Sequence, residues 1–113
     1  EVTIDEQDIF NVTMNESLAV ALLTNLLKNA FVHNIDEGHI RITVTKNSIT
    51  FRNSGVENPL DKEHIFERFY QGTKKEGSTG LGLAIADSIC RLQHLSIRYY
   101  FEQKEHCFEI SRQ

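Results

Sequence analysis

Apolar side chains recur with helical spacing in two stretches of the chain. The first stretch follows Asn15, a residue type that caps the N-termini of helices. Its apolar positions form two stripes: Leu18, Ala21, Leu22, Leu26 and Ala30, and Val20, Leu23, Leu27 and Phe31. Two such stripes are too wide for a surface helix, so the pattern predicts a helix that is central to the fold. A second stretch, from Leu81 to Leu92, predicts another helix.

Elsewhere apolar and polar residues alternate, which is typical of strands with one buried face. Residues 40–51 alternate around a short polar turn at Lys46-Asn47, which predicts an antiparallel hairpin. Residues 95–110 predict a closing strand pair, and residues 2–12 predict one or two short edge strands. The order of these elements indicates helices on one face of a mixed sheet.

A long polar connection over residues 54–79 separates the hairpin from the second helix. Connections of this length inside a small domain are uncommon and usually functional. Four of the six glycines crowd into its end and the following helix start: Gly72, Gly77, Gly80 and Gly82. Since glycine adds backbone freedom, we expect this connection to act as a mobile lid.

Length and composition exclude several classes of protein. A chain of 113 residues with 40% hydrophobic content is long enough for one compact domain and too short for two, so we expect a single domain over residues 1–113. The net charge is −4 and no basic run exceeds Lys74-Lys75, which argues against nucleic-acid binding. No apolar run approaches the roughly 18 residues of a membrane span. Cys90 and Cys107 lack metal-site or redox spacing and are expected to be buried thiols.

Two amides interrupt the first apolar helix. Asn25 and Asn29 are four residues apart, so they lie on the same side of the helix. A buried amide without a partner costs about 1–3 kcal/mol, so each must bond to neighbouring backbone, to a loop or to a ligand. A polar turn also follows the central hairpin at residues 53–55, where backbone could approach a ligand closely.

Four short motifs, taken in order, resemble the nucleotide-binding domain of sensor histidine kinases. "NLLKNA" resembles its N box, "NSG" its G1 box, "IFERFYQG" its F box and "STGLGLAI" its G2 box. This ATP-binding fold is shared with gyrase, heat-shock chaperones and mismatch-repair ATPases. The resemblance implies the Bergerat-type fold, an α+β two-layer sandwich with a mixed, mainly antiparallel sheet and helices packed on one face. It also implies Mg²⁺ and ATP as cofactors.

By this resemblance, the N and G2 boxes hold the phosphates. Asn29 is the expected Mg²⁺ ligand, because Mg²⁺ keeps several waters and needs few protein oxygens. Gly80, Leu81 and Gly82 are expected to contact the phosphates, because backbone N–H groups and the positive end of the helix dipole meet there.

The catalytic position of the N box holds Asn25. Hydrolytic relatives have a glutamate at this position, which activates water. An amide cannot accept a proton at neutral pH, so we expect poor ATP hydrolysis. A kinase tolerates this loss, because its nucleophile is an imidazole.

In the G1 box, Asn53 replaces the family's aspartate and is expected to accept a hydrogen bond from the adenine amino group, with Gly55 beside it. The second G1 glycine is absent. The closing hairpin, residues 104–108, also lacks the Gly-Thr pair common in the family. We expect weakened nucleotide affinity from the altered G1 box.

The remaining candidates keep two interpretations each. Lys74-Lys75 could reach the terminal phosphates or be solvated, and Arg68 could pair with phosphate or with lid carboxylates. His33 could border the adenine pocket or lie in the core. Phe66 and Phe69 are expected to dock the lid on the core.

None of the five histidines is followed by an acidic residue, as a phosphoacceptor histidine of this family typically is. The resemblance therefore implies a catalytic domain that acts on a separate dimerisation and phosphoacceptor helical domain, with a response regulator downstream. The expected location is cytoplasmic, as part of a membrane-anchored sensor kinase, with the domain itself not inserted in the membrane. A degenerate nucleotide-binding pseudokinase is the alternative. An anti-sigma-type serine kinase is another, although Asn25 counts against it.

Overall fold

One five-stranded sheet underlies the computed structural model, which describes residues 2–32, 38–54, 64–67 and 82–112. Along the chain the elements are β1 (Val2–Glu6), α1 (Glu16–Val32), β2 (Ile40–Val44), β3 (Ser48–Ser54), α2 (Gly82–Leu92), β4 (Leu95–Glu102) and β5 (Glu105–Arg112). The strand order in the sheet is β1-β2-β3-β5-β4. β1 pairs with β2 in parallel, and the other three pairings are antiparallel.

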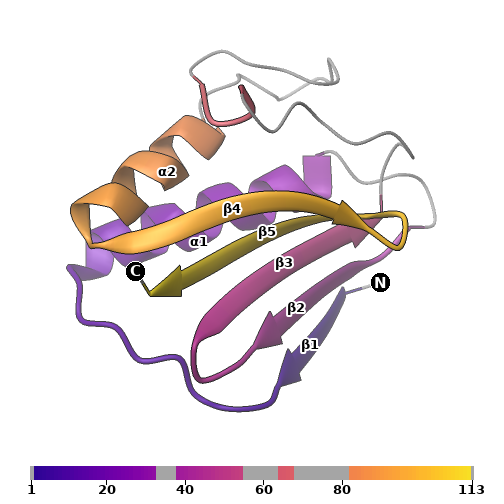
Figure 1. Ribbon diagram of the computed structural model, residues 1–113, viewed down its shortest axis with the longest axis horizontal. Coiled ribbons are helices and arrows are strands. Elements are labelled where there is room, and N and C mark those ends of the chain that lie inside the picture. The colour runs from indigo at the N-terminus through magenta and orange to yellow at the C-terminus, as the bar shows by residue number, and fades with distance from the viewer. Residues whose placement is uncertain (1, 33–37, 55–63, 68–81, 113) are drawn as a thin grey trace.

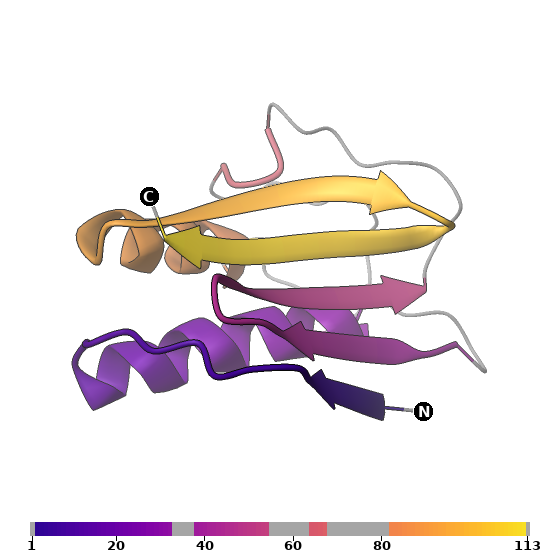
Figure 2. The same cartoon turned by 60° about the horizontal axis from the view of Figure 1, so that its bottom comes forward.

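Both helices pack on the same face of this sheet (Figure 1, Figure 2). The arrangement confirms the predicted α+β two-layer sandwich with a mixed, mainly antiparallel sheet. The predicted edge strand, the central hairpin and the closing strand pair are also confirmed.

Asn15 caps α1, as its residue type predicts. Its Oδ1 accepts hydrogen bonds from the backbone N–H of Ser17 at 2.8 Å and of Leu18 at 3.4 Å. These bonds satisfy two of the four N–H groups that have no partner inside a helix. The helix therefore begins where its apolar pattern begins.

The prediction that α1 is central was wrong for one of its two apolar stripes. Leu22, Leu26 and Ala30 are buried, at 3%, 1% and 1% exposure. In the second stripe, Val20 and Phe31 are more than half exposed. In a two-layer sandwich the sheet covers only one side of a helix, so the opposite stripe has no layer to bury it.

The β4–β5 hairpin closes through a tight turn at Gln103 and Lys104. Both residues have positive φ, at 51° and 63°. Two consecutive left-handed residues are typical of a type I′ turn, whose twist matches that of the strands it joins. The turn aligns Tyr99 with Phe108 and Ile97 with Ile110, which places their side chains on the helix-covered face.

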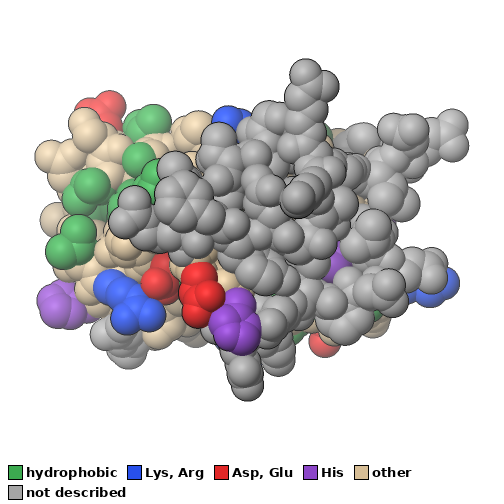
Figure 3. Space-filling model, turned by 90° about the horizontal axis from the view of Figure 1, so that it is seen from above, with side chains coloured by type: hydrophobic (Ala, Val, Ile, Leu, Met, Phe, Trp, Pro, Cys, Tyr) green, Lys and Arg blue, Asp and Glu red, His purple; other side chains and the backbone are tan. Residues whose placement is uncertain are grey.

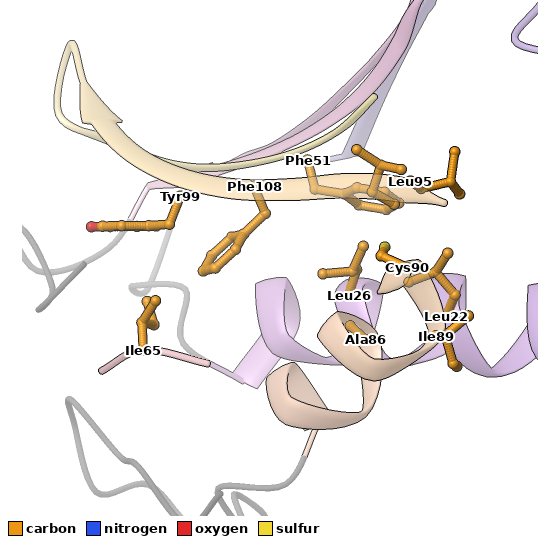
Figure 4. Close-up of a cluster of buried hydrophobic side chains, with 11 residues drawn as sticks. Leu22, Leu26, Phe51, Ile65, Ala86, Ile89, Cys90, Leu95, Tyr99 and Phe108 are labelled. Atoms are coloured by element: carbon orange, nitrogen blue, oxygen red, sulfur yellow. The ribbon is translucent and has the colours of Figure 1, made fainter. Parts of the chain in front are cut away.

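The core lies between the sheet and the two helices (Figure 4). Phe51 and Phe108 point from β3 and β5 toward Leu26 on α1. Ile65, from the short described part of the long connection, is also buried here. Its neighbour Phe66 meets Phe108 edge to face, with ring centroids 6.2 Å apart. Phe66 thus docks on the core as predicted, whereas Phe69 lies outside the described residues.

Both cysteines are free and buried, as predicted. Burial raises the pKa of the Cys90 thiol to about 11, and the nearby Asp87 adds to this. Burial likewise raises the pKa of Cys107 to about 11, against an opposing effect of Arg52. Both thiols are therefore protonated and unreactive at neutral pH. Among the described residues, no helix has the length and apolarity needed to cross a bilayer.

We predict that Leu26→Ala lowers the free energy of unfolding by about 2–5 kcal/mol, because it removes a fully buried side chain and leaves a cavity. The matched control is Leu23→Ala on the same helix, where the side chain is 43% exposed. The control should cost less than about 1 kcal/mol. Urea unfolding measures both, and equal losses would contradict the assignment of the buried face.

Candidate functional site

Asn25 lies against the start of α2. Its Nδ2 donates a hydrogen bond to the backbone carbonyl of Ala21 at 2.8 Å. Its Oδ1 would lie 3.2 Å from a Cβ atom at Gly82, which is closer than most real Cβ contacts. The amide is thus held by its own helix and fills the space that a side chain at position 82 would need. One of the sequence alternatives, a bond to neighbouring backbone, is realised for the Asn25 NH₂ group.

Asn29 lies one turn further along α1, on the same side. Its side chain is partly buried, and among the described residues it makes no hydrogen bond. A neutral amide oxygen is a suitable ligand for Mg²⁺, which needs one or two protein oxygens when phosphates and waters complete its shell. The donor chemistry at Asn29 therefore fits the metal that the family resemblance implies.

α2 begins at Gly82, directly beside Asn25. The first N–H groups of a helix have no partner inside it, and the helix dipole adds positive potential at the same place. No acidic residue lies in the first turn of α2 to counter this potential. The start of α2 can therefore favour an anionic group.

Asn53 is the next-to-last residue of β3 and lies on the helix-covered face of the sheet, two residues beyond core Phe51. Its side chain is only 2% exposed. Nδ2 donates to the backbone carbonyl of Ser54 at 2.9 Å. Only the NH₂ group can donate to a carbonyl, so this bond fixes the amide orientation and leaves Oδ1 as the acceptor. Figure 1 shows the C-terminal ends of α1 and β3 at the same end of the molecule.

The sequence prediction missed His106, which lies next to Asn53 in the sheet, and Tyr99, which contacts His106 from β4. His106 is opposite Asn53 in the β3–β5 pairing and is 4% exposed. Its Nδ1 lies 2.7 Å from the hydroxyl oxygen of Tyr99. Strand alternation could have indicated His106, because it shares the inward positions of β5 with Phe108 and Ile110.

A separate hollow of about 410 Å³ lies on the sheet face that the helices do not cover. Its lining residues are Thr3, His39, Ile40, Arg41, Gln103 and Glu105. The Glu105 carboxylate is 2.6 Å from His39 Nε2 and 2.9 Å from Arg41 Nη2. The carboxylate in this hollow is thus paired with His39 and Arg41. The hollow is lined by charged groups, in contrast to the neutral amides on the other face.

The other predicted site residues lie outside the described residues: His33, Gly55, Arg68, Lys74, Lys75, Gly80 and Leu81. They remain predictions. In Figure 3, where the molecule is seen from above, hydrophobic side chains of the described residues gather at one end. On α2, Ile85 and Leu92 are exposed, and Arg91 pairs with Asp87 at 2.9 Å.

These amides are carried by an α+β two-layer domain of a class that occurs in a large ATPase family. The chain belongs to the histidine kinase-, DNA gyrase B- and HSP90-like ATPase family, whose model matches residues 14–111.

Curated relatives place it with the sensor histidine kinases. Sensor histidine kinase RppB of Synechocystis sp. is 42% identical over 84 residues, covering 66% of this chain and 18% of that protein. Heme sensor protein HssS of Staphylococcus epidermidis is 36% identical over 94 residues, covering 80% of this chain and 21% of that protein. The chain thus spans about a fifth of the length of these relatives.

Solved structures agree with this placement. The catalytic domain of histidine kinase ThkA superposes with a TM-score of 0.81 at 25% identity, covering 97% of this chain and 76% of that one. Mycobacterial sensor histidine kinase MprB gives a TM-score of 0.83 at 19% identity, covering 99% and 84%. The second likeness shows the fold alone.

We predict that Asn25 and Gly82 are energetically coupled. Replacing glycine by alanine at a position of ordinary φ, such as Gly82, stabilises a protein by about 0.4–1 kcal/mol. In the wild-type background the methyl group of Gly82→Ala presses on Asn25 Oδ1, so this gain should be lost. In an Asn25→Ala background the gain should return, with a coupling of at least about 0.5 kcal/mol. Urea unfolding of the four proteins measures it, and the same effect in both backgrounds would refute the contact.

Proposed function

We propose that this chain is the catalytic domain of a two-component sensor histidine kinase. It binds Mg·ATP and transfers the γ-phosphoryl group to a histidine on a separate dimerisation and phosphoacceptor helical domain. The observation that carries this proposal is the pair of α1 amides, with Asn25 set against the start of α2 and Asn29 one turn away without a partner among the described residues.

Recognition of the base is assigned to Asn53. Its Oδ1 acceptor, fixed by the Nδ2 bond to Ser54, matches a purine that carries an amino group, as adenine does. A 6-oxo purine would bring a second acceptor to the same place, and two facing acceptors repel. The orientation of one buried amide therefore supports ATP over GTP.

The phosphates are assigned to the start of α2 and to Asn29. The N–H groups around Gly82 favour anionic oxygens through the helix dipole. Asn29 holds and orients the metal from the side of α1. When bound, Mg²⁺ supplies the neutralisation of phosphate charge that phosphoryl transfer needs.

Asn25 favours transfer to an imidazole over hydrolysis. In the proposed step, the bond between the γ-phosphorus and the bridging oxygen breaks and ADP leaves, while a phosphorus–nitrogen bond forms to the acceptor histidine. The unprotonated nitrogen of a neutral imidazole attacks without losing a proton, whereas an attacking water must give up a proton to a base. Asn25 cannot accept that proton, and its NH₂ group is bound to the helix backbone.

The remaining parts of the proposal concern the longer protein. We propose one domain over residues 1–113 within a chain that also holds the phosphoacceptor helices, with a response regulator downstream and a cytoplasmic location. Gly55, Gly80, Leu81, His33, Arg68, Lys74 and Lys75 stay predicted contributors. A degenerate nucleotide-binding module is the second candidate, because Asn53 offers the base a neutral amide in place of a carboxylate.

We predict that Mg·ADP raises the unfolding temperature of the wild-type chain and that Asn29→Ala abolishes the magnesium-dependent part of the shift. Ligand at 100 times its Kd stabilises by about 2.7 kcal/mol, which differential scanning fluorimetry resolves easily. Asn29 is assigned to the metal, so the variant should retain the smaller shift produced by ADP without Mg²⁺.

The matched control is Asn11→Ala, an exposed asparagine outside the helices. It should behave like the wild type. Loss of the shift in the control, or an unchanged magnesium effect in Asn29→Ala, would contradict the assignment. Nucleotide binding without transfer to an isolated phosphoacceptor domain would favour the degenerate module.

A further inference from the structure

A buried histidine lies opposite the proposed base-binding amide in the sheet, and a buried tyrosine on the next strand contacts its ring. His106 pairs with Asn53 on one side and with Phe101 on the other. Directly opposite residues in a sheet project to the same face with Cβ atoms about 4.5–5.5 Å apart. Since Phe108, two residues along β5, is in the core, His106 and Asn53 both face the helix side of the sheet. The two polar side chains are therefore neighbours at the end of the core.

The His106 ring is held in one orientation by β4. Its Nδ1 is 2.7 Å from the Tyr99 hydroxyl oxygen, and the two rings stack with centroids 5.9 Å apart and planes at 21°. The ring of Phe101 packs from the other direction, with centroids 4.9 Å apart. Whichever of the two groups is the donor, this hydrogen bond holds Nδ1 toward β4. Tyr99 and Phe101 thus fix the position of the imidazole.

Packing alone does not explain why the polar side chains of His106 and Tyr99 are buried here. The inward positions further along β5 hold the hydrocarbon side chains of Phe108 and Ile110, which are 2% and 1% exposed. Burying a histidine and a tyrosine hydroxyl is costlier than burying hydrocarbon, even when they bond to each other. His106 is the polar member of these inward positions, and it lies at the end of β5 that pairs with Asn53 on β3.

We propose that His106 is a specificity-determining residue for the nucleobase and that Tyr99 is its positioning residue. The proposal rests on the proposed function, since it extends the base-binding end defined by Asn53. Purines differ in the donors and acceptors along the edge that carries position 6. Asn53 meets this edge with one acceptor, and His106, its neighbour across the sheet, contributes an imidazole whose ring Tyr99 holds in place.

The test compares the binding of Mg·ADP and Mg·IDP, which differ only along one edge of the base: a 6-amino group with an N1 acceptor in ADP, and a 6-oxo group with an N1–H donor in IDP. Titration calorimetry on the 113-residue chain gives the ratio of the two dissociation constants. His106→Phe keeps an aromatic ring for packing and removes both ring nitrogens. It should reduce the preference for ADP by at least about fivefold, the scale expected when a polar base contact is lost. Tyr99→Phe should reduce it in the same direction by a smaller factor.

Tyr100→Phe is the matched control, because Tyr100 is on the same strand but on the opposite face, beside Arg98. Its ADP preference should equal that of the wild type. A purely structural His106 would weaken both nucleotides by the same factor, and that result would overturn the proposal. If His106→Phe does not fold, as judged by its unfolding temperature, His106→Gln is measured by the same ratio.

The wild-type titration distinguishes failure of this inference from failure of the proposed function. Wild-type binding of ADP with an unchanged ADP-to-IDP ratio in the His106 and Tyr99 variants overturns this inference and leaves the proposed function standing. Absence of binding by either nucleotide to the wild type overturns both.

Discussion

The packing of α1 on the sheet is the constraint on which the proposed site depends. Leu22 and Leu26 bury one side of the helix against Phe51, and this contact fixes the rotation of α1 about its axis. Asn25 and Asn29 lie on the flank of the same buried side, so the core that stabilises the fold also aims the two amides. A change in this packing would turn the amides away from the start of α2.

The sequence predicted most of the fold, because its local signals agree with the tertiary structure. Asn15 was recognised as a cap from its residue type, and the alternating strands were recognised from their buried faces. The exposure of Val20 and Phe31 could not be predicted in this way. Periodicity shows which residues of a helix are apolar, but the number of layers that cover the helix is set by the whole topology.

The candidate site was only partly predictable for a similar reason. Asn25, Asn29 and Asn53 lie within motifs and could be named from sequence. The contact of Asn25 with Gly82 joins residues far apart in the chain and needs the packing of α1 beside α2. His106 and Tyr99 were missed because their bond depends on the register of the β4–β5 hairpin, which a turn with two left-handed residues determines.

The most direct test of the account is a ¹H–¹⁵N correlation spectrum of the chain during titration with Mg·ADP. We predict that shifts concentrate on the side-chain amides of Asn29 and Asn53 and on the backbone amide of Gly82. Residues of the uncovered sheet face, such as Arg41 and Glu109, should change little. Shifts clustered on the uncovered face, or none at saturating nucleotide, would contradict the claim that these amides form a nucleotide site.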